Sequence, residues 1–382
     1  MFPTLWKHII WGFFRNFFIC LFGIILLLLS TKIEEVARFI ALGASILNIL
    51  SFILYQIPYV TQIGIPIAAL IAGFSLFSQM SKDGEITAAR SSGYSLTTIL
   101  FPIFLSGALL SILMIFIFDI SATSHLASKK LEFDVRENQP LAAFQNTRFL
   151  NKHGIALELT GSLQTGKNAE NLLLCFPSHS NDRLSLLILK ETISEKENVK
   201  GHEMTVISSQ APPSSHDCFG SLIVENAQKN NTPITHIHEM TQTHSWKIAA
   251  DHLPLSVVLA RQKELSQARL SRHYQGHSAK KLSKQLGKYQ SEPFRRLSLI
   301  IAAFTLSFAG AIYGIRNTKR PRRGVYVLGP LLSFGIFIAS YLIGKTVHEF
   351  ALIAIFFYVI PHPILIFSAS IFKNRIEHGM EY

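Results

Sequence analysis

One stretch in the middle of the chain has nearly the residue order that holds a nucleotide phosphate. Gly161-Ser-Leu-Gln-Thr-Gly-Lys-Asn168 has the glycine spacing and the lysine of a P-loop, whose backbone amides surround phosphates. The last position requires Ser or Thr to ligate magnesium, and here it is Asn168. The residues that follow favour a strand over the required helix. Gly344-Lys345-Thr346 lacks the first glycine of the motif. We therefore expect that this chain binds no nucleotide cofactor and does not hydrolyse ATP itself.

Metal and redox chemistry have little support in the sequence. His236, His238 and His244 would share one face of a strand, but no carboxylate or cysteine stands at ligand spacing beside them. We expect a solvated strand face and no metal site. Cys175 and Cys218 could form one disulfide, and the sequence leaves this open. No Ser-His-Asp order or carboxylate pair stands out, so the chain is not predicted to be an enzyme.

Two cations, Lys32 and Arg38, lie where the first apolar run ends. A lysine offers a point charge and an arginine a bidentate fork, and both bind phosphate. Glu34 and Glu35 stand between them and offer local partners, in which case the two long side chains simply snorkel. Two interpretations stay open, namely local ion pairs and a binding site for the phosphates of an anionic lipid.

A short polar segment, SKDGEITAARSSGYS at positions 81–95, separates two long apolar runs. Asp83 is the predicted N-cap of a helix, and Glu85 falls in its first turn, where negative charge suits the helix dipole. Arg90 lies near the other end, and Gly93 is the predicted C′ residue.

Two small residues, Ala88 and Ala89, leave an open face beside Glu85. This segment has no apolar stripe of its own. It is either a solvated hairpin loop or a coupling helix that inserts into a cytoplasmic motor subunit.

The elements that position these residues are membrane spans. The 382 residues are 49% hydrophobic and only 16% charged, with a mean hydropathy of +0.31, which is too apolar for an ordinary soluble domain. A bilayer core of about 30 Å requires roughly 20 apolar residues per helix. Six runs qualify: Phe17–Leu29 with its flanks, Ile57–Phe77, Leu96–Phe118, Leu297–Ile315, Val325–Ile343 and Phe350–Phe372. We expect the first to be retained, because no small-x-small cleavage site follows it.

Between the third and fourth runs the sequence becomes polar, with short alternating segments separated by turn residues. We expect strands at Ile155–Leu159, Leu184–Leu189, Met204–Ile207, Leu222–Val224 and Ile234–Met240, with turns that include Gly201 and Asn230-Asn231. The predicted organisation is spans one to three at 1–119, a β-jelly-roll-like domain at 120–260, a polar helical connector at 261–293 and spans four to six at 294–382.

The charge distribution predicts the orientation. Arg316-Asn-Thr-Lys-Arg-Pro-Arg-Arg323 has five basic residues and no acidic one, so this loop is predicted to be cytoplasmic. Counting spans then places both termini and the 81–95 segment inside, and the β-rich region outside. The net charge of +12 is scattered without a stacking motif, so no nucleic-acid partner is expected.

The pattern Glu85-Ile-Thr-Ala-Ala-Arg90-x-x-Gly93 resembles the lipopolysaccharide export permeases of the LptF/LptG (YjgP/YjgQ) family. The resemblance extends along nearly the whole chain as three spans, an extracytoplasmic β domain and three spans. Further local matches are Pro58 and Pro66 in the second span, the polar approach at 289–296 and the basic turn at 316–323. The amino-acid sequences of 83–95 and of Ser124–Phe149 resemble LptF more than LptG.

This resemblance implies an α-helical membrane protein with six transmembrane helices, arranged 3+3, and an inserted extracytoplasmic β-jelly-roll-like domain. It implies a permease in the inner membrane of a Gram-negative-type bacterium that extracts lipopolysaccharide. The implied partners are an LptB-like ATPase dimer, an LptG-like second permease and an LptC-like periplasmic protein. The implied coupling residues are Glu85, Ala88, Ala89, Arg90 and Gly93. Lys32 and Arg38 are the implied lipid phosphate ligands, and Lys32 matches its position better than Arg38.

Two other functions remain as alternatives. A secondary transporter usually places ionisable residues at the membrane midplane, and the predicted spans contain almost none. A membrane-anchored scaffold or sensor requires neither six spans nor the Glu85 segment. Replacing Glu85 with Ala leaves a scaffold working and uncouples a motor-driven exporter.

Overall fold

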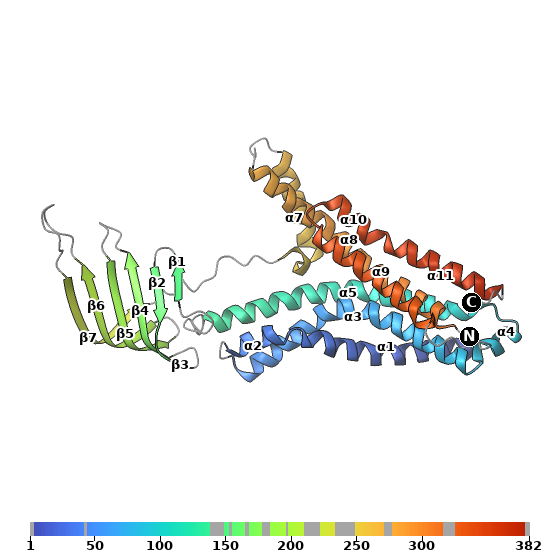
Figure 1. The fold of residues 1–382 in the computed structure, drawn as a ribbon, viewed down its shortest axis with the longest axis horizontal. Helices are drawn as coiled ribbons and strands as arrows, with labels where there is room; N and C mark the ends of the chain where they lie inside the picture. Colours follow the sequence, from blue (N-terminus) through green and yellow to red (C-terminus); the bar gives the residue numbers. More distant parts are fainter. Residues whose placement is uncertain are drawn as a thin grey trace. The chain divides into compact units, whose positions relative to one another are not determined.

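The computed structural model describes most of the chain, and its helices and strands are labelled in Figure 1. The described residues are 4–41, 44–137, 149–152, 155–164, 168–177, 184–195, 198–209, 222–233, 249–270, 277–315 and 325–378.

Six helical segments are long and apolar enough to cross a membrane, which confirms the predicted number of spans. They are α1 (Thr4–Ser30), α3 (Ile46–Lys82), α5 (Leu96–Glu137), α8 (His277–Gly314), α9 (Val325–Thr346) and the pair α10 (Ala351–Val359) and α11 (Pro361–Glu377).

Several helices extend well beyond their apolar runs. Helix α3 continues through Pro58 and Pro66, and α5 continues to Glu137, so residues 120–137 are helical although they were expected to begin the β domain. Hydropathy detects only the part of a helix that suits lipid, whereas the backbone stays helical until a breaking residue ends it.

The chain forms two compact units, one of which consists of Met1–Thr31, Leu54–Leu126 and Ile248–Tyr382. At its centre, α3 and α8 pack backbone to backbone. A Cβ added at Gly73 would lie 2.7 Å from the carbonyl oxygen of Ser307, and one at Gly310 only 2.2 Å from that of Leu70. One helical turn further on, a Cβ at Gly314 would lie 2.6 Å from the Phe74 carbonyl oxygen. Because glycine has no side chain, the backbones of the two helices come into close contact, as is common in pairs of membrane helices.

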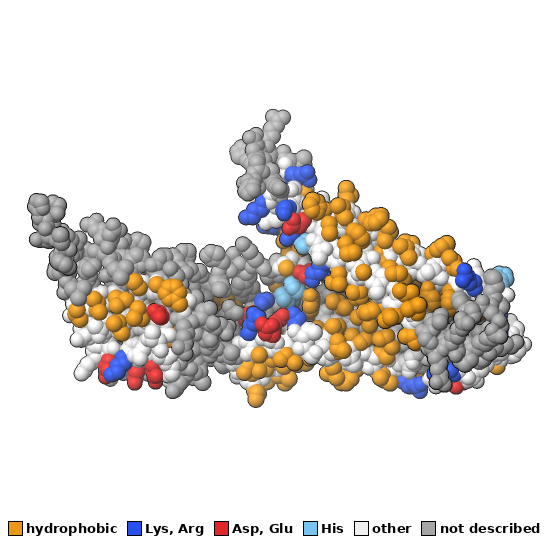
Figure 2. All heavy atoms as spheres, viewed as in Figure 1, with side chains coloured by type: hydrophobic (Ala, Val, Ile, Leu, Met, Phe, Trp, Pro, Cys, Tyr) orange, Lys and Arg blue, Asp and Glu red, His pale blue; other side chains and the backbone are white. Residues whose placement is uncertain are grey.

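The outside of this bundle is apolar. Large exposed hydrophobic side chains occur along α1, α5, α9, α10 and α11, and Figure 2 shows them covering the visible face of the helices. An apolar exterior is expected where helices face lipid, because the lipid core contains no water to form hydrogen bonds with polar side chains.

The polar connector before the fourth span is two helices instead of the single polar helix that was expected. Helix α7 spans Leu255–Leu270, and α8, which begins at His277, packs against α7. The short 3₁₀ helix η2 (Ala250–His252) precedes α7.

The second unit, Lys32–Ile53 and Ala127–Lys247, contains the β-sheet. Its strands are β1 (Phe149–Lys152), β2 (Ile155–Leu159), β3 (Leu163–Gln164), β4 (Asn168–Pro177), β5 (Leu184–Glu195), β6 (Asn198–Ser209) and β7 (Leu222–Pro233). All pairings are antiparallel, in the order β1-β2-β4-β5-β6-β7, with β3 on β4. This confirms an antiparallel sheet in the middle of the chain, while closure into a jelly roll stays a prediction.

Long strands explain two wrong turn predictions. Gly201 pairs with Thr192 on one side and with Asn230 on the other, so both predicted turn residues lie inside strands. Continuous ladder hydrogen bonds between neighbouring strands outweigh the local turn preference of Gly and Asn. The expected strand at 234–240 lies outside the described residues.

Candidate functional site

Helix α4 (Glu85–Ser91) forms within the predicted 81–95 segment and begins at a left-handed glycine. Gly84 is the N-cap, with φ of 75°, and no side chain caps the helix, so the prediction of Asp83 as N-cap is wrong. The reason is that the Asp83 amide donates to the Gln79 carbonyl oxygen at 2.9 Å and therefore still belongs to the end of α3. The chain turns at Gly84, where glycine has no Cβ to resist a positive φ.

The other end of α4 confirms Gly93 as the C′ residue. Gly93 has φ of 90°, and its amide donates to the Arg90 carbonyl oxygen at 3.0 Å. The Tyr94 amide donates to the Ala89 carbonyl oxygen at 3.1 Å. These two bonds form a Schellman motif, which satisfies the last carbonyls of the helix. A left-handed glycine therefore bounds α4 at each end.

One side of α4 is held by the bundle. Ile86 is only 5% exposed and belongs to the apolar core, and Ala89 packs against that core. The Glu85 carboxylate lies 3.6 Å from His8 Nε2 on α1. Ala88 and Arg90 are exposed, so the two predicted alanines do not form one open face. The outward surface of α4 consists instead of Thr87, Ala88, Arg90 and Ser91.

Lys32 and Arg38 each have a carboxylate partner on helix α2 (Ile33–Ala41). Lys32 Nζ lies 2.5 Å from Glu35 Oε1, and Arg38 forms an ion pair with Glu34. The hydrogen bond from Arg38 and its positive charge lower the pKa of Glu34. Arg38 is exposed and Lys32 is half-buried, and exposed pairs of this kind contribute little to stability. The exposed pair between Arg38 and Glu34 is therefore weak, whereas Lys32 is partly shielded from solvent.

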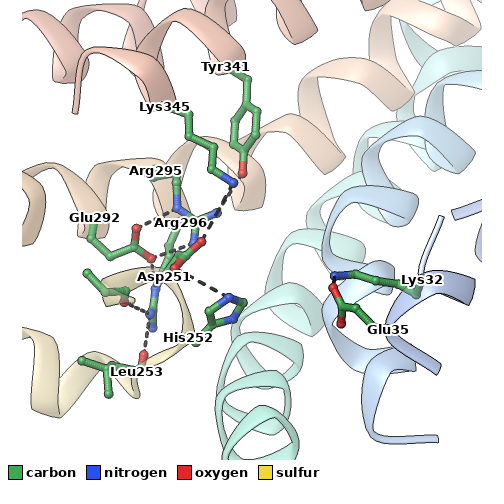
Figure 3. Close-up of polar contacts among 11 residues, drawn as sticks. Lys32, Glu35, Asp251, His252, Leu253, Glu292, Arg295, Arg296, Tyr341 and Lys345 are labelled. Carbon is green, nitrogen blue, oxygen red and sulfur yellow. Dashed lines mark hydrogen bonds and ion pairs between the residues drawn. The ribbon is translucent and has the colours of Figure 1, made fainter. Parts of the chain in front are cut away.

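A buried ionic cluster lies where α8 enters the apolar bundle, at Glu292, Arg295 and Arg296, whose side chains are at most 7% exposed (Figure 3). Arg295 donates from Nε and Nη2 to the two Glu292 oxygens, both at 2.7 Å, and from Nη1 to Tyr341 Oη on α9 at 2.8 Å. Arg296 Nε donates to Glu292 Oε1 at 2.9 Å. One carboxylate thus binds both guanidinium groups.

The second guanidinium also holds the chain that leads into α7. Arg296 Nη2 donates to the carbonyl oxygen of Leu253 at 2.5 Å and to that of Ala250 at 3.5 Å. Its Nη1 has no hydrogen-bond partner among the described residues, and the guanidinium lies 5.8 Å from the Phe118 ring centroid on α5. A cation over an aromatic face compensates part of that missing bond.

The η2 segment contacts three further helices. His252 stacks on His125 of α5 with ring centroids 3.6 Å apart, and its ring lies 5.0 Å from that of Tyr59 on α3. Asp251 Oδ2 lies 3.9 Å from Lys345 Nζ at the end of α9. Burial alone would raise the pKa of Asp251, but His252 and the cations Arg295 and Lys345 outweigh burial and hold this pKa below its usual value. We call the η2 residues with Glu292, Arg295 and Arg296 the connector clamp.

Sequence reasoning missed the connector clamp as a site. Its signal is Glu292-x-x-Arg295-Arg296, an acid followed by two bases at helical i,i+3 and i,i+4 spacing just before an apolar run. From the sequence, these residues were expected only as part of a polar approach to the fourth span. The partners Leu253 and Lys345 are distant in sequence, so spacing alone could not identify them.

The remaining candidate residues lie in the middle of the chain. Asn168 begins strand β4, as expected for a segment that is not a P-loop, and Ser162 Oγ donates to Glu170 at 2.7 Å. Cys175 lies on β4, whereas Cys218 and His236, His238 and His244 lie outside the described residues.

Comparison with known proteins gives one result that covers nearly the whole chain. The family model described as lipopolysaccharide export system permease LptF/LptG matches residues 7–375. No curated protein matches the chain. The match includes the six apolar helices, the antiparallel sheet and helix α4, in the order that the family layout implies. The chain therefore belongs to the LptF/LptG family of lipopolysaccharide export permeases.

Proposed function

We propose that this permease withdraws lipopolysaccharide from the inner membrane of a Gram-negative-type bacterium with energy from a separate ATPase. The family membership and the six apolar helices support a transport role. Burying one CH₂ group is worth about 0.8 kcal/mol, so removing a lipid with several acyl chains requires an external source of energy.

The single observation that carries the proposal is the construction of α4. Ile86 is buried in the core and Ala89 packs against that core, while Thr87, Ala88, Arg90 and Ser91 face outward. A structural loop has no need of a folded helix with a glycine turn at each end. Such a helix suits a groove on the surface of an LptB-like ATPase, with Glu85, Ala88, Ala89, Arg90 and Gly93 as the coupling residues.

The path from α4 to the outer end of the bundle is continuous. Helix α3 leads directly into α4, and α3 packs backbone to backbone on α8 at Gly73 and Gly310. At the other end of that helix pair, Arg296 holds the connector through Leu253. A movement imposed on α4 by nucleotide turnover would therefore reach the segment that joins the β domain to the spans.

In this proposal Lys32 and Arg38 meet the phosphates of the lipid after releasing Glu35 and Glu34. The β domain lies outside the inner membrane and receives the acyl chains, and both termini are cytoplasmic. An LptG-like second permease completes the cavity, and an LptC-like protein accepts the lipid. The weak, exposed ion pair between Arg38 and Glu34 supports the exchange of carboxylate for phosphate.

The test is co-purification of the ATPase with the tagged permease in mild detergent. In Ala88→Arg, a long charged side chain projects from the exposed face of α4, and we expect the ATPase to be lost while a second six-span permease is retained. Lys130→Ala, at an exposed position near the other end of α5, is the matched control and should retain both partners.

The other functions make different predictions. A scaffold or a secondary transporter would be recovered without an ATPase, and Ala88→Arg would then leave its partners unchanged. Recovery of the wild-type chain alone from well-folded material would overturn the exporter proposal.

A further inference from the structure

Helix α7 and the first half of α8 form a strongly cationic hairpin. Between residues 255 and 290 the only acidic residue is Glu264. The basic residues of this stretch are Arg261, Lys263, Arg269, Arg272, Lys280, Lys281, Lys284 and Lys288. Figure 2 shows Lys and Arg side chains gathered on the described part of this hairpin.

The length of α8 requires that this hairpin stand outside the lipid core. Helix α8 has 38 residues, and at 1.5 Å per residue it is about 57 Å long, nearly twice a bilayer core of about 30 Å. Its uncharged part begins at Leu297, so the lysine-bearing turns before it lie beyond the hydrocarbon region.

Apolar side chains at the base of the hairpin indicate that it adjoins the membrane surface. Leu255, Val257 and Leu259 at the start of α7 are exposed, and so are Phe294 and Leu297 on α8. Exposed apolar residues next to a cationic segment are typical of elements that lie at the interface between lipid and water.

The nearby carboxylates are already occupied. Glu264 lies 2.6 Å from Arg261, and Glu349 in the α9–α10 turn lies 2.7 Å from Lys284 and 3.7 Å from Lys288. The two lysines lower the pKa of Glu349, chiefly because Lys284 donates a hydrogen bond to its carboxylate.

Among the hairpin cations whose side chains the structure describes, three exposed ones remain. Lys263, Arg269 and Lys281 pair with no carboxylate in the part of the chain that the structure describes. They need an anionic partner from outside this chain, or they remain solvated.

Their position is opposite to the usual charge bias of membrane proteins. Lys and Arg normally gather on the cytoplasmic side, as they do at 316–323. In the proposed topology the α7–α8 hairpin lies on the other side, so the bias does not account for its eight basic residues.

We propose that the α7–α8 hairpin is a docking surface for the phosphate-bearing headgroups of anionic lipids in the outer leaflet beside the permease. This inference rests on the orientation given under the proposed function. It does not require the motor. Lys263, Arg269 and Lys281 attract the headgroups, while Leu255, Val257 and Leu259 rest against the acyl chains. The surface concentrates anionic lipid next to the bundle before any of it is transported.

The experiment measures the lipid selectivity of the purified permease, without ATPase, in phosphatidylcholine vesicles. Electron spin resonance compares spin-labelled phosphatidylglycerol with spin-labelled phosphatidylcholine in the immobilised lipid at the protein surface. In the triple variant K263E/R269E/K281E we expect the preference for phosphatidylglycerol to fall by at least about fivefold, the effect of one cation near an anionic surface. The charge-conserving control K263R/R269K/K281R should keep the wild-type preference.

A second measurement fixes the side of the membrane. Gln267→Cys, with the native cysteines replaced by serine, should react with a membrane-impermeant maleimide from the extracytoplasmic side, and Thr87→Cys only after the membrane is opened. Reaction of Gln267→Cys only from the cytoplasmic side would overturn the inference together with the proposed orientation. Unchanged lipid selectivity in the triple variant, with or without loss of a protein partner or a second copy, would overturn this inference alone and leave the ATPase result under the proposed function intact.

Discussion

Arg296 donates a hydrogen bond from Nη2 to the carbonyl oxygen of Leu253 at 2.5 Å, and this bond joins the fourth span to the segment that enters α7. The same guanidinium donates from Nε to Glu292. One arginine therefore connects a buried carboxylate to a backbone segment 43 residues earlier in the chain. The fixed planar fork of arginine makes this possible, because a lysine would present a single point charge.

Removing the carboxylate of this cluster should destabilise the protein strongly. In Glu292→Ala, Arg295 and Arg296 remain buried without the carboxylate that binds both of them, and breaking a buried pair in this way costs about 3–5 kcal/mol. The measurement is thermal unfolding in detergent. Glu264→Ala, which removes an exposed partner of Arg261, is the control and should change stability by no more than about 0.5 kcal/mol.

The close contact between α3 and α8 predicts that adding one methyl group at Gly310 destabilises the protein. Gly310→Ala places a Cβ 2.2 Å from the Leu70 carbonyl oxygen, which forces the helices apart and should cost about 1–3 kcal/mol. Gly335→Ala on α9 is the matched control, because its Cβ would meet no atom within 4 Å. The prediction is contradicted if both variants lose the same fraction of monodisperse protein after heating.

The C-terminal end of α4 should tolerate asparagine but not valine at position 93. Gly93 has φ of 90°, which costs a residue with a Cβ about 1–2 kcal/mol, and asparagine enters left-handed conformations more easily than other residues. We expect Gly93→Val to retain less ATPase during purification and Gly93→Asn to retain an amount close to wild type. Equal loss in both variants would show that the side chain, and not the backbone conformation, decides the outcome.

Acid should loosen the connector through Asp251. Its pKa is lower in the folded protein than in the unfolded chain, so its contribution to stability is complete above a pH of about 4 and is lost as the pH falls through the folded value. Asp251→Asn removes this contribution. We expect thermal unfolding to show a difference between wild type and Asp251→Asn at pH 7 that shrinks in strongly acidic buffer. A constant difference would show that the carboxylate charge does not matter.

The proposed binding of lipid phosphate by Lys32 predicts that the sign of the charge at position 32 decides transport. Lys32→Glu places a second negative charge beside Glu35 and repels phosphate, whereas Lys32→Arg keeps the charge and adds a fork. With the complete exporter in vesicles, we expect lipopolysaccharide release to fall at least tenfold in Lys32→Glu and ATPase binding to remain. If Lys32→Glu releases lipid at the wild-type rate, Lys32 does not bind the lipid phosphates.

The spans and the family could be predicted from the sequence because lipid imposes a simple length and composition. Leu96 begins both the expected and the observed third span, and Ile155–Leu159 is an observed strand with its predicted bounds. The ends of α3 and α5 were less predictable, because polar residues can continue a helix that began in an apolar run. The turn expected at Gly201 failed because its strand neighbours lie far away in sequence.

The site was predictable only in its local part. Gly93 could be recognised from its position after an apparent helix, whereas the N-cap fell one residue beyond Asp83 because α3 had not yet ended. The connector clamp depends on contacts between Arg296 and Leu253 and between Asp251 and Lys345. These contacts exist only after the helices have packed, and no short sequence pattern specifies them.

Because a left-handed glycine bounds α4 at each end, this segment can be exchanged between related chains as a unit. The stretch from Gly84 to Gly93 turns into and out of its helix with its own backbone, and Ile86 is its one side chain deep in the core. Exchanging that stretch between related chains requires no repacking of the spans as long as an aliphatic residue stays at position 86 and a small one at position 89. Under the proposed function, the contact with the ATPase can therefore diverge during evolution without altering the packing of the spans.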